Sequence, residues 1–265
     1  MKVDVSPVKK GLSPFSFFPG RGFFLQAAAV LVYAPFFFVM LCVFSGPAFP
    51  EDILIDENFD NLDDWVPVLF PKIDRHSEYT VQKTDAGSML VARSNASASG
   101  IRFVREFNVY EYPVVRWRWK VENVYKGGDA ERKSGDDYPL RVYVIFKYDP
   151  GKAGIRERIL YGLARTVYDE YPPHSSLNYI WANRSHERII YPSPYTDRAR
   201  LVILRAGEAE TGMWKEEEVH ILDDYAEAFA SPPPATASIA IMNDSDNTGE
   251  SSVSYLDYIQ VLRKE

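Results

Sequence analysis

Cysteine is almost missing from this chain of 265 residues, because Cys42 is its only thiol. Cys42 lies within an apolar run near the N-terminus, so residues 50–265 contain none. Disulfides, thiolate catalysis and cysteine-ligated zinc are therefore excluded for that part of the sequence. Its stability must come from a buried core, and its length is enough for one all-β domain.

Sequence signatures of familiar enzymes are missing too. The four histidines, at 76, 174, 186 and 220, lie too far apart for a metal motif, and no H-E-x-x-H occurs. There is no G-x-S-x-G elbow, no glycine-rich phosphate loop and no E-x-D-x-x-E run of the jelly-roll glucanase kind. These absences favour a non-catalytic protein. A glycoside hydrolase or a polysaccharide lyase stays an alternative.

Positive charge is scarce beyond the N-terminus. The whole chain carries 30 Lys and Arg against 37 Asp and Glu, a formal charge of −7. Residues 1–49 hold four of the bases and one of the acids, which leaves 26 bases and 36 acids, or −10, for the remainder. Binding nucleic acid requires a clustered basic face, so no nucleic-acid partner is expected.

The N-terminal segment, residues 1–49, is predicted to be a signal peptide or a membrane anchor. Basic residues precede the apolar run FFLQAAAVLVYAPFFFVMLCVFS at 23–45, and Gly46-Pro47-Ala48 has the small residues that signal peptidase accepts. Cleavage after Ala48 is favoured, although the run is long enough to span a bilayer. Both alternatives predict an exported protein of the periplasm or cell envelope. Contact with the inner membrane is expected only through 23–45, and only if that segment is uncleaved.

Residues 50–265 are predicted to form a single antiparallel β-sandwich of the jelly-roll type. Short segments rich in Val, Ile, Tyr, Trp and Phe alternate with turn residues, as is typical of sandwiches and barrels. Strands are predicted at 53–59, 79–84, 88–94, 100–108, 114–121, 140–148, 158–164, 178–183, 187–191, 200–206, 214–220, 237–243 and 253–262. One short helix is predicted at 222–230, followed by three prolines.

Two strands carry the candidate binding face. In VVRWRWKVE (114–122) and LRVYVIFK (140–147), one face of each strand is apolar and the other carries Arg, Lys and Tyr. If the strands are neighbours, Arg116, Arg118, Arg141 and Tyr143 form a cationic surface suited to a carbohydrate or an anionic ligand. The alternative is a solvated outer face with cross-strand ion pairs.

Two acidic loops are predicted to lie at the rim of that face. Asp136 and Asp137 precede Arg141, and adjacent residues of an extended chain point to opposite faces, so they do not suit the paired carboxylates of a glycosidase. An Asp–Arg ion pair is favoured over ligand binding and catalysis. Asp244 and Asp246 lie in MNDSDNTG, which fits a turn or an ion-binding loop but lacks the full EF-hand pattern.

Five motifs in order resemble a known family. They are SGDDYPLRVYVIF, LNYIWAN, YPSPYTDRARLVILRAG, DDYAEAF and IAIMNDSDNTGESSVSYLDYIQV. Together they resemble a bacterial family of exported proteins that is catalogued only as a domain of unknown function, over about 56–262. In LNYIWAN, the alternation places Tyr179 and Trp181 on one face, which we expect to be core rather than a sugar-stacking platform.

A second, weaker resemblance is to carbohydrate-binding jelly rolls of the galactose-binding type. It rests on IDENFDNLDDW (55–65) and YLDYIQV (255–261). The resemblance implies that the two ends of the domain pair and that a structural calcium lies beside them, held by Glu57 and Asp257. The alternative is that Asp257 caps a turn or pairs with an arginine. No other cofactor is expected.

The sequence therefore predicts an exported, non-catalytic β-sandwich that binds a carbohydrate or another polar ligand of the cell envelope. A structural or assembly role in the envelope is a further alternative to the enzyme hypothesis.

Overall fold

The structure is a computed structural model that describes residues 52–264, except 86, 152–153, 156–160 and 162–171. All described residues belong to the second of the two units into which the chain divides, residues 49–265. The predicted signal or anchor segment lies outside the described residues, and so does all but Tyr161 of the strand predicted at 158–164. Within the described part of the chain, no helix is both long and apolar enough to span a bilayer.

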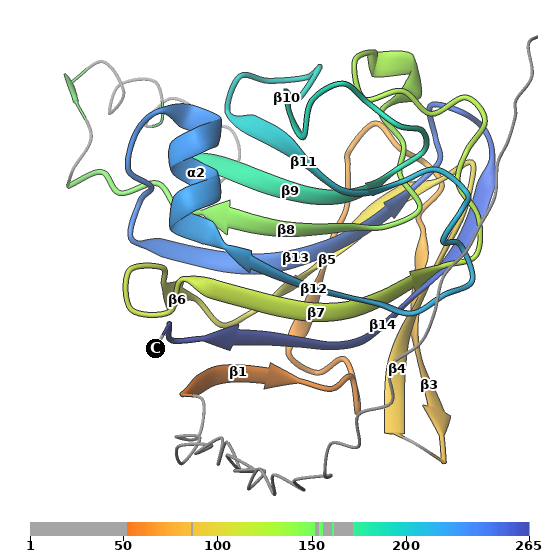
Figure 1. The fold of residues 1–265 in the computed structure, drawn as a ribbon, viewed down its shortest axis with the longest axis horizontal. Helices are drawn as coiled ribbons and strands as arrows, with labels where there is room; N and C mark the ends of the chain where they lie inside the picture. The colour runs from red at the N-terminus through yellow and green to blue at the C-terminus, as the bar shows by residue number, and fades with distance from the viewer. Residues whose placement is uncertain (1–51, 86, 152–153, 156–160, 162–171, 265) are drawn as a thin grey trace, which may run out of the picture. The chain divides into compact units, whose positions relative to one another are not determined.

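Two β-sheets make up the described unit (Figure 1). The six-stranded sheet consists of β12 (Lys215–His220), β7 (Val114–Val121), β14 (Ser251–Leu262), β4 (Gly87–Asn95), β3 (Glu78–Thr84) and β1 (Ile53–Glu57). The eight-stranded sheet consists of β10 (Ile190–Pro192), β11 (Ala199–Ala206), β9 (Ser175–Ala182), β8 (Arg141–Phe146), β13 (Thr236–Asp244), β5 (Ala98–Phe103), β2 (Trp65–Val68) and β6 (Phe107–Asn108). The predicted all-β sandwich is confirmed. Among the described strands, every pair is antiparallel except β9–β11, which is parallel.

The core lies between the two sheets and is centred on aromatic side chains. Trp117 and Trp119 point inward from β7, and Tyr179 and Trp181 point inward from β9. Ring centroids are 5.5 Å apart for Trp117 and Tyr179 and 5.8 Å apart for Trp119 and Trp181. Burying a large apolar side chain contributes about 1.5–3 kcal/mol, so this cluster is a main source of stability in a thiol-free domain. The prediction that Tyr179 and Trp181 are core residues is confirmed.

The prediction that the strands 114–121 and 140–148 are neighbours is wrong. β7 lies in the six-stranded sheet and β8 in the eight-stranded sheet, and the loop 122–140 crosses from one to the other. Each strand does have one apolar face, but these faces meet across the core instead of lying side by side. The polar faces of β7 and β8 therefore point to opposite sides of the sandwich.

β14 joins the two ends of the domain. Its first half pairs with β4 and its second half with β1, where Ile53 lies opposite Leu262. The change of partner coincides with a bulge between Leu256 and Tyr258, so Asp257 lies at the irregularity. The pairing of first and last strands agrees with what the resemblance to galactose-binding jelly rolls implied.

The predicted helix is confirmed with a shift of one residue. α2 spans Ile221–Phe229 and has Asp223 and Asp224 in its first turn, where carboxylates favour the positive end of the helix dipole. It ends at Ala230, whose φ of 52° is left-handed. Tyr225 packs against Phe146 of β8, so the helix covers one end of the core. A single-turn 3₁₀ helix, η1 (Lys133–Gly135), lies in the loop before β8.

Candidate functional site

Three of the sequence motifs meet at one end of the sandwich. Asp137, in the loop before β8, accepts hydrogen bonds from Asn247 Nδ2 at 3.0 Å and from Thr248 N at 2.6 Å in the turn after β13. Asn183, which follows β9, donates to Asp137 O at 2.6 Å and accepts from Tyr125 N at 2.8 Å. GDDYPLR, LNYIWAN and NDSDNTG are thus parts of one hydrogen-bonded structure.

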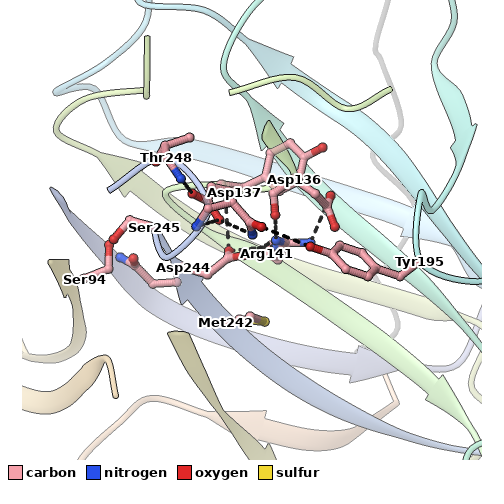
Figure 2. A network of polar contacts seen from close by, with 12 residues as sticks. Ser94, Asp136, Asp137, Arg141, Tyr195, Met242, Asp244, Ser245 and Thr248 are labelled. Carbon is pink, nitrogen blue, oxygen red and sulfur yellow. Dashed lines mark hydrogen bonds and ion pairs between the residues drawn. The ribbon is translucent and has the colours of Figure 1, made fainter. Parts of the chain in front are cut away.

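Arg141 lies at the centre of this structure and is only 4% exposed. Figure 2 shows Asp136 and Asp244 converging on its guanidinium group. Arg141 Nε donates to Asp244 Oδ1 at 2.9 Å, Nη2 donates to Asp244 Oδ2, and Nη1 lies 3.5 Å from Asp136 Oδ1. The ring of Tyr138 stacks 4.4 Å from the guanidinium carbon. The predicted Asp–Arg ion pair is confirmed for Asp136, and Asp244 is a second partner.

Negative charge exceeds positive charge in this network. Asp136, Asp137, Asp244 and Asp246 would together contribute four charges against the one of Arg141. Burial raises the pKa of Asp244 to about 7, and the neighbouring carboxylates add to the effect. Burial also raises the pKa values of Asp136 and Asp246. The raised pKa of Asp244 favours a proton on this network up to about pH 7, because three buried carboxylates and the half-buried Asp246 share a single cation.

Hydrogen-bond donors already bind two of the three carboxylates that are close enough together to hold a metal ion. Oxygen atoms of Asp137, Asp244 and Asp246 lie within 4.8 Å of one another. However, N–H donors already occupy both oxygens of Asp137, and Arg141 occupies both oxygens of Asp244. Calcium requires six to eight oxygen ligands that face the ion, so the donors already bound to Asp137 and Asp244 count against a calcium site at this position.

Glu57 and Asp257, the predicted calcium ligands, are held by separate partners. Glu57 accepts from Phe59 N at 2.5 Å and from Trp65 Nε1 at 3.1 Å. Asp257 pairs with Arg118 at 2.8 Å, which confirms the alternative in which it binds an arginine. The two residues belong to paired strands, but their carboxylates are used for different contacts.

The acidic residues also do not form a glycosidase site. Glycosidases need two carboxylates roughly 5–9.5 Å apart that flank an open cleft. Here Asp137 and Asp244 are 0% and 2% exposed, and both are occupied by donors. Asp136 and Asp137 precede β8 and are not part of an extended strand, so the alternation argument did not apply to them. They nevertheless bind different partners, Arg141 and the turn at Thr248.

The arginines of β7 do not join this network. Arg116 pairs with Glu218 at 2.7 Å and Arg118 with Asp257 at 2.8 Å on the outer face of the six-stranded sheet. Arg118 also lies 5.0 Å from the Trp214 ring. The alternative of a solvated face with cross-strand ion pairs is confirmed for this sheet.

Tyr143 lies on the outer face of the eight-stranded sheet, where its hydroxyl donates to Met242 Sδ at 3.3 Å. Its cross-strand neighbour is Asn178 of β9, which is 4% exposed. Among the described residues, Asn178 Oδ1 has no hydrogen-bond partner. The predicted site residues therefore fall in two places: Arg116 and Arg118 lie on one sheet, and Tyr143 lies on the other sheet next to Arg141 and its network of aspartates.

A chain of small polar side chains extends from this network between the sheets. Ser94 Oγ lies 2.9 Å from the Tyr125 hydroxyl, which lies 2.6 Å from Ser252 Oγ. Ser252 donates to Asn243 Oδ1 at 3.1 Å, and Asn243 directly precedes Asp244. Each hydroxyl has a partner, so the chain is a rigid, satisfied structure. In Figure 2, Ser94 lies on the side of the drawn residues that is farthest from Tyr195.

Beside Ser94 lies an open polar groove of about 580 Å³. It is lined by residues before and on β3, at the end of β4, after β7 and at the start of β14: Arg75, His76, Glu78, Arg93, Ser94, Asn95, Ser97, Asn123, Ser251, Ser252 and Val253. This volume is within the range of roughly 300–1,000 Å³ typical of small-molecule sites. Sequence reasoning missed the groove. The available signal was the serine-rich segment SNASAS (94–99) at the end of the strand predicted at 88–94, directly after Arg93.

The fold and the groove define a β-sandwich domain without cysteine that carries an open polar groove. The chain belongs to the family described as "Protein of unknown function (DUF3047)", which matches residues 63–260. The prediction of a family catalogued only as a domain of unknown function is thereby confirmed. No curated protein matches the chain.

Several solved structures resemble this fold. A family 11 carbohydrate-binding module of Clostridium thermocellum is 10% identical, with a TM-score of 0.41 over 82% of this chain and 96% of that one. A family GH12 endoglucanase 3 of Trichoderma harzianum is 8% identical, with a TM-score of 0.34 over 71% and 85%. Lectin I-B4 of Griffonia simplicifolia is 8% identical, with a TM-score of 0.34 over 78% and 98%. Likenesses this distant do not bear on what the chain binds.

Proposed function

We propose that this protein is an exported, non-catalytic β-sandwich that binds a carbohydrate or another polar ligand of the cell envelope in the groove beside Ser94. The observation that carries the proposal is the groove itself, an open volume of about 580 Å³ lined almost entirely by polar side chains. Amide and hydroxyl groups such as Asn95, Asn123 and Ser251 can donate to and accept from the hydroxyls of a sugar.

The floor of the groove supports a binding role. Ser94 and Ser252 are fixed by each other and by Tyr125 at 2.6–3.1 Å, so the groove does not need to reorganise around a ligand. A preorganised site loses less entropy on binding. In this proposal, the Arg141 network positions the loops that border the groove and does not touch the ligand.

The buried carboxylates support a role without catalysis. Asp137 and Asp244, the acids closest to a two-carboxylate arrangement, are covered and bonded to donors. A general acid or base must reach the reacting atoms, and these two cannot.

Calorimetric titration and a glycan array with the purified protein test the proposal. We expect binding to at least one envelope saccharide, weakened about two- to tenfold by Asn95→Ala, since one neutral hydrogen bond contributes about 0.5–1.5 kcal/mol. Gln82→Ala, an exposed amide elsewhere on the same sheet, is the matched control and should leave binding unchanged. Failure to bind any saccharide would sink the proposal.

Export is tested separately. N-terminal sequencing of protein recovered from the cell envelope should begin after Ala48 if the segment is cleaved. Recovery of the protein with the cytosolic fraction would contradict export.

A further inference from the structure

We infer that the groove is built for an acidic saccharide, with Arg75 and Arg93 as the groups that recognise its negative charge. The inference rests on the proposed function and specifies its ligand class. It arises from an imbalance: residues 50–265 carry −10, from 26 bases and 36 acids, yet the groove contains two guanidinium groups and one carboxylate. Local charge of the opposite sign to the rest of a protein attracts a ligand by electrostatic focusing.

The two groove arginines differ from those elsewhere on the same sheet. Arg116 and Arg118 form ion pairs with carboxylates at 2.7 and 2.8 Å. Among the described residues, neither Arg75 nor Arg93 has an ion pair, and Arg93 makes only a 3.5 Å contact from Nη1 to Thr80 Oγ1. Glu78 is the cross-strand partner of Arg93 in the β3–β4 register, yet the two side chains do not pair. Both guanidinium groups are exposed and available to a ligand.

The two arginines approach the groove from separate, well-anchored elements. Arg93 projects from β4, which is an internal strand of the six-stranded sheet, between β14 and β3. Arg75 lies in the loop before β3, and its carbonyl accepts a hydrogen bond from Ala98 N of β5 at 3.0 Å. Strands therefore set the backbone positions of both residues, from which the two guanidinium groups extend to the groove. A guanidinium group binds a carboxylate, sulfate or phosphate through two parallel hydrogen bonds, which an ammonium group does not match.

The remaining groups in the groove indicate that a simple anion would not use all the hydrogen-bonding groups that line it. Asn95, Asn123 and Ser251 are neutral donors and acceptors, and Asn123 is itself held by a 3.0 Å hydrogen bond from Nδ2 to Ser251 O. Neutral groups of this kind match hydroxyls. A ligand that uses both sets of groups carries many hydroxyls and one or more acidic substituents, which is the chemistry of uronic, sulfated or phosphorylated saccharides.

The test is a glycan panel in which each carboxylated, sulfated or phosphorylated saccharide is paired with its neutral parent. The purified full chain in mild detergent is titrated with the strongest acidic binder and its parent. We expect the acidic form to bind about tenfold or more tightly, since hydrogen bonds to charged groups contribute about 1.5–3 kcal/mol. Binding should weaken from low to high salt, because the contacts are solvent-exposed.

Variants locate the effect. Arg93→Ala and Arg75→Ala should each reduce affinity for the acidic form about tenfold or more while leaving affinity for the parent nearly unchanged, and Arg93→Lys should restore only part of the loss. Arg116→Ala, an arginine on the outer face of the same sheet, is the matched control. Thermal melting of each variant checks that the fold is kept.

The outcomes separate this inference from the proposed function. Equal binding of acidic and neutral forms, with both reduced by Asn95→Ala, overturns the inference and leaves the proposed function standing. Acidic binding that is unaffected by Arg75→Ala and Arg93→Ala also overturns it. If no saccharide in the panel binds, both the inference and the proposed function are wrong.

Discussion

Two asparagines of the LNYIWAN segment should respond in opposite directions to the same substitution. Asn178 is 4% exposed, and its Oδ1 has no partner among the described residues. Asn183 is 7% exposed and bonds to Tyr125 N and Asp137 O at 2.8 and 2.6 Å. Leucine has nearly the shape of asparagine but no polar atoms. The substitution Asn→Leu at each position therefore isolates the contribution of the side-chain amide and its hydrogen bonds to the unfolding free energy.

The magnitudes follow from the partners. A buried polar group without a hydrogen bond costs about 1–3 kcal/mol, so Asn178→Leu should raise the unfolding free energy by about 1–2 kcal/mol after imperfect packing is allowed for. Asn183→Leu instead leaves two backbone groups, Tyr125 N–H and Asp137 C=O, buried and unpaired. At about 1–3 kcal/mol each, this loss should amount to about 2–6 kcal/mol.

Urea unfolding followed by tryptophan fluorescence measures both effects as shifts of the midpoint at constant slope. The buried Trp117, Trp119 and Trp181 make fluorescence a sensitive probe of the core. A loss of stability in Asn178→Leu comparable with that in Asn183→Leu would refute the reasoning, because it would mean that Asn178 has a partner of its own in solution.

Three further predictions concern the Arg141 network. The unfolding free energy should fall as pH rises from about 4 to about 7, by at most about 1.4 kcal/mol per pH unit, because folded Asp244, with a pKa of about 7, holds a proton that the unfolded chain releases. Urea titrations across this range check the sign, and Asp244→Asn should flatten the dependence. Arg141→Met should destabilise by about 3–5 kcal/mol in the same assay, because it leaves buried carboxylates without their cation; a loss below 1 kcal/mol would contradict this. Gly128→Ala places a Cβ at 1.9 Å from Asn183 Nδ2, whereas a Cβ at Gly127 would have its nearest neighbour, Thr248 Cγ2, at 3.3 Å. The first substitution should lower the thermal midpoint by several degrees and the second by little, and equal effects would show that the loop adapts.

Local sequence patterns were sufficient to predict individual strands. The predicted strand 114–121 and the observed Val114–Val121 are identical, because alternation of Val and Trp with Arg and Lys is itself a period-two signal. The helix was predicted to within one residue, because its acidic first turn and the prolines that follow it mark its two ends. The short strand Trp65–Val68 was missed, because four residues containing a proline provide little pattern.

Sheet membership could not be predicted in the same way. The alternation in 114–121 and 140–147 indicates that each strand has an apolar face, but not which strand that face meets. Trp119 of β7 contacts Trp181 across the core, 62 positions along the chain, and no local pattern reports such a contact. The predicted joint surface of Arg116 and Arg141 failed for this reason.

Part of the candidate site could be predicted from the sequence. The proximity of Asp136 to Arg141 favoured an ion pair, and the structure contains it. The stronger partner, Asp244, is 103 residues further along and is brought close only by the β8–β13 pairing. The groove could not be recognised from the serine-rich segment SNASAS alone, because residues such as Asn95 and Ser251 have the composition of ordinary turns.

The pairing of β1 with β14 has a consequence for how this sandwich can be connected to other chains. Asp52 and Arg263, at the two ends of the described unit, form an ion pair at 2.8 Å, and Arg263 N donates to Asp52 O at 3.0 Å. The unit therefore begins and ends at one point, which is the geometry that tolerates circular permutation and insertion into a surface loop of a host protein. A short linker joining residues 264 and 52, with the new C-terminus at the exposed Asp85, should yield a folded permuted protein whose first strand is β4.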